Sequence, residues 1–205
     1  MTQIKILVAV SLLMATSCYY APSTLPPGGM YQPGDYLRGL GGPAQGPQQP
    51  GSRDSVSHWD GDGVPGAPSI RIDISDQRAY FYKGGKLVGV SPVSTGTSTH
   101  PTPTGSFKIT QKSANHRSNL YGEIFDANGY VVNKEADSRK DRVPPGGKFV
   151  GASMPHFMRF HGGVGMHVGY LPGFPASHGC VRMPDHMAKI FYYNVQHGTP
   201  VTVTY

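Results

Sequence analysis

The chain has 205 residues, of which only 15% are charged, and it carries a formal net charge of +6 together with 28 glycines and 19 prolines. This length fits one domain with additional segments rather than two full domains, and the glycine and proline content predicts that part of the chain is unstructured. A basic surface favours anionic partners such as cell wall, a membrane surface or nucleic acid, but the absence of a long Lys/Arg run argues against a nucleic-acid-binding protein.

The N-terminal residues 1–17 have the layout of a secretory signal peptide. Lys5 precedes an apolar stretch over residues 6–15, which is too short for a transmembrane helix because such a helix needs about 20 residues. Small residues then lead directly to Cys18, an arrangement that resembles a bacterial lipobox. We therefore expect a lipoprotein, anchored through Cys18 on the periplasmic side of the cell envelope. Cleaved secretion without a lipid and an uncleaved anchor are the alternatives.

Residues 18–68 are rich in Pro, Gly, Gln and Ser and contain few apolar side chains. Such a segment cannot bury enough apolar surface to offset the entropy lost on ordering. We therefore predict a disordered tether, which would suit an enzyme that is fixed to a membrane and acts on a polymer some distance away. A disordered tail without a role is the alternative.

From residue 69 the pattern changes to short strands with alternating apolar and polar residues. The strands are expected at residues 69–75, 79–82, 87–94 and 106–111. The Gly-Gly pair within residues 83–86 predicts a hairpin turn between the second and third of them. Short strands with close turn signals are typical of an antiparallel β domain.

Residues 112–149 are harder to assign, and only residues 130–132 predict a strand there. An irregular insertion of this length inside a domain is usually functional or mobile, so we expect it to form a wall or lid near the active site.

The C-terminal residues predict one helix and one closing strand. A helix is expected over residues 183–196, with Pro184 in its first turn and Gly198 just after its end. Its apolar face would consist of Met187, Ile190, Phe191 and Val195. Residues 200–205 alternate Val and Thr, which predicts a strand.

Four residues that could carry chemistry lie within twenty positions: His161, His167, His178 and Cys180. A lone thiol in an exported protein is liable to oxidation, so its presence points to a chemical role. A histidine that takes up the thiol proton would make Cys180 a strong nucleophile, and local spacing allows His178 to be that base.

The residues around Cys180 could complete such a site. Gly179 permits a tight turn that would leave the N–H groups of Gly179 and Cys180 open to a developing oxyanion. Arg182 lies two residues after Cys180, can share a strand face with it, and could bind a substrate carboxylate.

Two other interpretations of these residues remain. Three histidines and one cysteine could bind zinc, although the spacing lacks a His-x-x-x-His or Cys-x-x-Cys unit. Alternatively, the histidines lie in a glycine-rich surface loop and Cys180 is a small buried apolar residue.

The C-terminal part of the chain resembles the L,D-transpeptidase catalytic domain, the YkuD family. The family signature is a histidine, a gap, and then Ser/Thr-His-Gly-Cys, an apolar residue and Asn or Arg. Here it reads His167, a gap that is shorter than usual, and Ser-His-Gly-Cys-Val-Arg at residues 177–182. Residues 102–109 match the family's Thr-Pro-x-Gly-x-Phe turn, and the resemblance covers residues 69–205.

The resemblance implies a role for each matching residue. Cys180 would be the nucleophile and His167 its base, with the carbonyl of Val168 orienting the imidazole. The residues implied to shape the oxyanion pocket or contact substrate are Ser177, His178, Gly179 and Arg182. His161 is a further site candidate because of its position in the sequence.

The resemblance also implies a fold and an activity. The fold would be mostly β: a mixed β-sheet sandwich with a short C-terminal helix and an irregular insertion. Cys180 would form a thioester with a peptidoglycan stem tetrapeptide, release D-alanine, and pass the acyl group to an amine, or to water as a carboxypeptidase. No cofactor or metal is implied, and we expect a monomer. A catalytically silent wall-binding lipoprotein and a zinc-dependent wall hydrolase are the alternatives.

Overall fold

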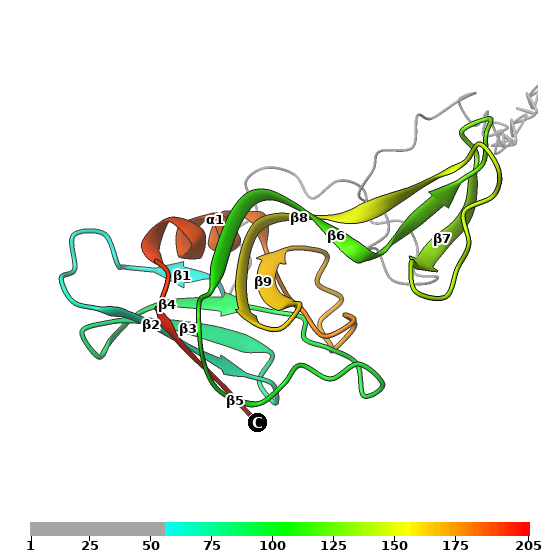
Figure 1. Cartoon of the computed structure of the whole chain (residues 1–205). Coiled ribbons are helices and arrows are strands. Elements are labelled where there is room, and N and C mark those ends of the chain that lie inside the picture. Colours follow the sequence, from blue (N-terminus) through cyan, green and yellow to red (C-terminus); the bar gives the residue numbers. More distant parts are fainter. Residues whose placement is uncertain (1–55) are drawn as a thin grey trace, which may run out of the picture. The chain divides into compact units, whose positions relative to one another are not determined.

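The computed structural model of the protein describes residues 56–205. The predicted signal peptide, Cys18 and the tether up to residue 55 lie outside the described residues. The described part forms a six-stranded sheet, a five-stranded sheet and one helix (Figure 1). Each sheet contains one parallel pair among antiparallel pairs, which confirms the predicted mostly β fold with mixed sheets.

The first sheet is built from short strands with one buried face. Its strands, in spatial order, are β1 (His58–Trp59), β4 (Lys86–Pro92), β3 (Arg78–Lys83), β2 (Pro68–Asp73), β11 (Pro200–Thr204) and β5 (Gly105–Lys108). The predicted hairpin between β3 and β4 is confirmed, because Gly84 and Gly85 both adopt positive φ angles there. β11 pairs in parallel with β2 and antiparallel with β5, so the C-terminal strand lies inside the sheet, next to the edge strand β5.

The second sheet contains the two longest strands of the described chain. Its order is β10 (Val181–Met183), β9 (Val164–Val168), β8 (Lys148–His161), β6 (Gln111–Phe125) and β7 (Val131–Asp137). Figure 1 shows β6 and β8 running side by side from the region of β9 out to β7. The distal half of this pair, together with β7, forms an arm that consists of residues 118–151.

The arm corrects the prediction of an irregular insertion at residues 112–149. Most of this segment is strand, and the predicted short strand at 130–132 is part of the longer β7. The alternation of apolar and polar residues is weak in β7 because most of this strand is partly or fully exposed, so few of its positions require an apolar residue. The expectation of a wall near the site is taken up below.

Three predicted boundaries also differ from the structure. β1 falls within the predicted tether and is held to the domain because Trp59 packs edge-on against Phe81, with ring centroids 5.3 Å apart. The predicted strand at 106–111 is two strands, β5 and the start of β6. The helix α1 (Asp185–Asn194) is shorter than predicted, because residues 181–183 form β10.

The hydrophobic core lies where strands of both sheets meet α1. Period-two burial in β2 and β3 supplies Ile70, Ile72, Ala79 and Phe81, and α1 buries Met187, Ala188 and Phe191. Val181 and Met183 of β10 belong to the same cluster. The strand that follows Cys180 is therefore fixed on one face by the core.

Candidate active site

The predicted nucleophile and base come from two neighbouring parallel strands. His167 lies in β9, and Cys180 directly precedes β10, in which Arg182 is paired with His167. Alternation along β10 sends Val181 into the core and leaves Cys180 and Arg182 on the other face. Cys180, His167 and Arg182 all line one cavity of about 250 Å³.

The ring of His167 is almost completely buried, with 1% of its surface exposed. Its Nδ1 lies 2.7 Å from the carbonyl oxygen of Val168. Because a carbonyl can only accept a hydrogen bond, Nδ1 carries the proton and Nε2 keeps its lone pair. This confirms Val168 as the orienting group. Burial, with a smaller contribution from the positive charge of Arg182, lowers the pKa of His167 to about 4 despite this hydrogen bond.

The thiol of Cys180 is partly exposed and donates a long hydrogen bond, 3.9 Å, to the carbonyl oxygen of Gly163. Desolvation of the thiol by the surrounding protein raises the pKa of Cys180. A hydrogen bond from the Gly165 backbone and the charges of Arg182 and Arg159 act in the opposite direction. The resting site therefore favours a neutral thiol and a neutral imidazole in the same cavity.

The turn that presents Cys180 is closed by the hydroxyl of Ser177. This hydroxyl donates to the carbonyl of Cys180 and accepts a hydrogen bond from the backbone N–H of Gly179 at 3.1 Å. Gly179 has a φ of +108°, a conformation that residues with a side chain rarely adopt. The expectation that the Gly179 N–H is open to an oxyanion is therefore wrong, because Ser177 occupies it.

Residues 94–102, which follow β4 of the first sheet, form hydrogen bonds with this turn. Ser94 exchanges two backbone hydrogen bonds with Arg182, and Gly96 forms a parallel bridge with Ser177. A Cβ at Gly96 would lie 2.9 Å from Gly179 Cα, so only glycine allows this approach. Thr102 joins the two segments: its hydroxyl accepts from the Gly96 N–H and donates to the Gly179 carbonyl, both at 2.8 Å.

We expect Thr102→Val to destabilise the protein by about 1–3 kcal/mol, because it keeps the shape but leaves the buried N–H of Gly96 without its acceptor. Urea unfolding measures the change. Thr104→Val is the control, since Thr104 is exposed in the same loop. Equal unfolding free energies for the two variants would contradict the role assigned to the Thr102 hydroxyl.

The opposite wall of the cavity is a bulge in β6. The register between β6 and β8 shifts between Arg117 and Gly122, and the four residues in between all line the cavity: Ser118, Asn119, Leu120 and Tyr121. The Ser118 hydroxyl accepts hydrogen bonds from the N–H groups of Leu120 and Tyr121. Residues 112–149 therefore do supply a wall, as expected, although they do so from a strand.

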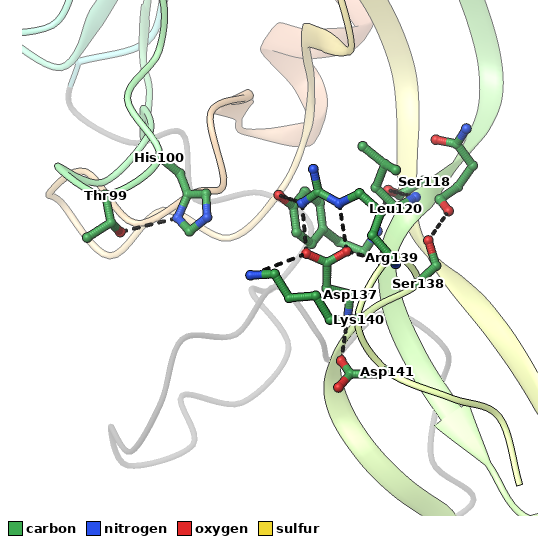
Figure 2. A network of polar contacts seen from close by, with 11 residues as sticks. Thr99, His100, Ser118, Leu120, Asp137, Ser138, Arg139, Lys140 and Asp141 are labelled. Carbon is green, nitrogen blue, oxygen red and sulfur yellow. Dashed lines mark hydrogen bonds and ion pairs between the residues drawn. The ribbon is translucent and has the colours of Figure 1, made fainter.

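An ion-pair network after β7 holds this bulge in place (Figure 2). Arg139 pairs with Asp137 at 2.7 Å and donates to the phenol oxygen of Tyr121 at 3.0 Å. Arg139 thereby holds the pKa of Asp137 well below its usual range. Ser138 donates to the carbonyls of Asn119 and Leu120, so the bulge is fixed by three consecutive residues.

The predicted alternative base, His178, forms part of the rim. Its ring stacks on Tyr121 with centroids 4.5 Å apart, and it meets His100 edge-on at 4.9 Å. Burial and the neighbouring charges of His100 and Arg182 lower the pKa of His178. Its ring thus makes aromatic contacts at the edge of the cavity that Cys180 lines, whereas His167 is fixed by a backbone hydrogen bond.

Two predicted features are not brought together with the rest. His161 is exposed, packs on Phe107 with ring centroids 4.8 Å apart, and does not line the cavity. Within residues 56–205 no three His, Cys, Asp or Glu side chains are grouped so that they could hold a metal ion, so the residues of the zinc alternative do not form a ligand set.

The same residues include no helix with the length and apolarity of a membrane span.

Several cavity residues were not predicted from the sequence. They are His116 and Tyr121 in β6, Met154 and Arg159 in β8, and the bulge residues next to Tyr121. Nothing in the local pattern of β6 marks its cavity-facing residues. Arg159 could have been noticed in the sequence. It is a charged residue between two apolar residues that prove to be buried, Met158 and Phe160, and it lies eight positions before His167.

Comparisons with known proteins agree with this geometry. The family model for "YkuD: L,D-transpeptidase catalytic domain" matches residues 67–203, which include both sheets apart from β1 and the end of β11. Among proteins with curated descriptions, none matches the sequence.

Solved structures of similar fold are L,D-transpeptidases. An L,D-transpeptidase from Mycobacterium smegmatis matches with a TM-score of 0.50 at 21% identity, over 68% of this chain and 59% of the other. The L,D-transpeptidase from Xylanimonas cellulosilytica matches with a TM-score of 0.51 at 20% identity, over 69% of this chain and 62% of the other. At these identities the likeness concerns the fold, and this chain spans about 60% of the length of those structures.

Proposed function

Because the chain belongs to the YkuD family of L,D-transpeptidase catalytic domains, we propose that it is a cysteine-dependent acyltransferase that remodels peptidoglycan, with Cys180 as nucleophile and His167 as base. One observation carries the proposal: the thiol and the imidazole line the same cavity from neighbouring parallel strands. The Val168 carbonyl holds the Nδ1 proton of His167, so Nε2 is the ring atom that can accept the thiol proton.

The first half-reaction forms a thioester. Sγ of Cys180 attacks the carbonyl carbon of the third residue of a stem tetrapeptide while its proton passes to Nε2 of His167. The C–N bond to D-alanine then breaks, and His167 returns the proton to the leaving amine. In the second half-reaction an amine attacks the thioester and the thiol is restored.

The pKa shifts indicate when the proton moves. Burial raises the pKa of Cys180 and lowers that of His167 to about 4, so a preformed thiolate–imidazolium pair is disfavoured before substrate binds. The proton transfer therefore accompanies the attack. The positive charges of Arg182 and Arg159 then stabilise the negative charge that develops at the sulfur and the carbonyl oxygen.

The oxyanion donor requires a revision of the sequence-based hypothesis. Ser177 occupies the Gly179 N–H and, by the same hydroxyl, fixes the Cys180 carbonyl. The backbone N–H of Cys180 is the donor that this turn can direct at a substrate carbonyl. Ser177 then acts as a positioning residue, because it sets the orientation of the peptide groups on both sides of the Gly179–Cys180 peptide.

The acceptor and the location belong to the same proposal. An amine of a neighbouring stem would give a 3–3 cross-link, water would give a carboxypeptidase, and a lysine of a lipoprotein would attach that protein to the wall. A lipid on Cys18 would keep the enzyme at the periplasmic side of the envelope, within reach of this polymer. The lipid and the location rest on the lipobox-like pattern at Cys18, whereas the sequence does not choose among the acceptors.

The test follows the acyl group on the protein. Purified protein is given a disaccharide tetrapeptide, and D-alanine release is measured by mass spectrometry. The intact mass is then recorded after exposure to a carbapenem, and the adduct is located by peptide mapping. We expect D-alanine release and a single adduct at Cys180. A protein that binds peptidoglycan but neither releases D-alanine nor gains an adduct is the silent wall-binding protein instead.

A further inference from the structure

The cavity contains an excess of positive charge. Arg159 and Arg182 both line it, and no Asp or Glu is present among its lining residues in the described part of the chain. The other residues that line the cavity are uncharged side chains or histidines. Burial, and in addition the charge of Arg159, lower the pKa of His116. A cavity with this composition favours an anionic group of the substrate.

Arg159 is held in a way that leaves its charge uncompensated. Its Nη1 donates to the carbonyl of Gly162 at 2.7 Å, and its guanidinium lies 5.4 Å from the ring centroid of Phe157. It forms no ion pair with any residue of the described range 56–205. Its buried Nε–H has no hydrogen-bond acceptor there.

The guanidinium lies close to the nucleophile. Arg159 donates to the carbonyl of Gly162, and the thiol of Cys180 donates to the carbonyl of the next residue, Gly163. Successive Cα atoms are about 3.8 Å apart, so the two side chains meet the same short turn within one or two peptide units. A group that is one residue or one short side chain away from the scissile carbonyl could reach Arg159.

We propose that Arg159 binds a carboxylate of the acyl-donor peptide inside this cavity. Such a group would supply the countercharge that the described residues do not, and charge-assisted hydrogen bonds from arginine to carboxylate are among the strongest in proteins. A stem tetrapeptide offers two sources: the terminal carboxylate of the leaving D-alanine, and the side-chain carboxylate of a diaminodicarboxylic acid at position three. This assignment rests on the proposed function and makes Arg159 a specificity-determining residue.

The experiment compares three donors with the full-length protein: the tetrapeptide, its C-terminal amide, and its position-three side-chain amide. We expect wild-type kcat/KM to fall about 10- to 100-fold for the amide at the source that Arg159 binds. Arg159→Met should lose a similar factor on the free tetrapeptide and should no longer distinguish that amide from the acid. The ratio of kcat/KM for the acid to kcat/KM for the amide, taken within each variant, cancels any change in the reactivity of Cys180.

Arg117→Met is the matched control. Arg117 also donates through Nη1 to a backbone carbonyl, that of Gly151, but it does not line the cavity. This variant should keep the wild-type preference for the acid. Arg159→Lys should recover only part of it, because lysine restores the charge without the planar fork.

A binding measurement separates this inference from the proposed chemistry. Calorimetry with Cys180→Ala protein, with and without Arg159→Met, gives the affinity for the same three peptides without turnover. If D-alanine is never released but binding still depends on Arg159 and one carboxylate, the subsite stands and the acyl transfer does not. An unchanged acid-to-amide ratio for both sources in Arg159→Met, or the absence of any peptide binding, overturns the inference.

Discussion

Cys180→Ala is expected to reduce D-alanine release from a stem tetrapeptide by at least about 10³-fold, because the proposed acyl intermediate forms on the sulfur that this substitution removes. The thiol donates only a long hydrogen bond, to the Gly163 carbonyl, and its side chain is only partly buried. The free energy of unfolding should therefore change by less than about 1 kcal/mol. Mass spectrometry of released D-alanine and urea unfolding of the same sample measure both quantities.

Cys180→Ser is the companion variant. Serine keeps the size and a hydrogen-bond donor, but its hydroxyl is a far weaker nucleophile than a thiol next to the same base. Both variants should lose the carbapenem adduct while retaining affinity for the tetrapeptide. If Cys180→Ala releases D-alanine as fast as wild type, the thioester mechanism is wrong.

His167→Asn is expected to lower kcat/KM for D-alanine release by about 10²- to 10⁴-fold, the usual contribution of a general base. Asparagine can keep a donor near the Nδ1 position and thus the contact with the Val168 carbonyl, but it cannot accept the thiol proton. In wild type the rate should be steady near neutral pH and fall as the pH approaches about 4, where the buried imidazole takes up a proton. A pH profile of kcat/KM measures this limb.

The same group affects stability, so the two effects must be separated. The folded pKa of His167, about 4, lies below its ordinary value of 6.5, so the unfolded chain binds the proton more readily between these pH values. Stability is therefore lost as the pH falls from about 6.5 through 4, by roughly 3 kcal/mol. His167→Asn should lack this loss in urea unfolding.

His161→Asn serves as the control for both measurements. This histidine is exposed and lies outside the cavity, so neither the rate nor the acid limb should change. An His167→Asn enzyme with wild-type kcat/KM would transfer the role of base to His178, the choice that local spacing also allows.

The sequence predicted the fold best where one face of a strand is buried. Ile70 and Ile72 alternate with polar residues because β2 covers the core, so the period-two pattern marks the strand. β6 and β8 carry no such pattern in the arm. Their pairing depends on close backbone approaches, such as that of Gly151 to the carbonyl of Ser118. The strand preferences of single residues do not predict such approaches.

The candidate site divides in the same way. Residues 177–182 are contiguous, so their chemistry could be inferred from one short motif, and the structure places Cys180 and Arg182 on one face of the cavity as expected. Tyr121 and Arg159 reach the cavity only through the pairing of β6 with β8, across about forty residues of sequence. The Gly179 amide was assigned wrongly because its acceptor is a side chain, and the backbone pattern of a turn does not reveal that contact.

The bridges from Ser94 and Gly96 to the turn around Cys180 have a mechanical consequence. The reactive groups are attached to one sheet, whereas the residues that clamp their turn follow β4 of the other sheet. A displacement of one sheet against the other would therefore act on the turn that carries Cys180 through these bonds, whereas the strand-pairing and hydrogen-bond partners of His167 lie within its own sheet. We therefore expect the distance between Cys180 and His167 to depend on the rigidity of the interface between the sheets, so that mutations in that interface change this distance without touching the cavity.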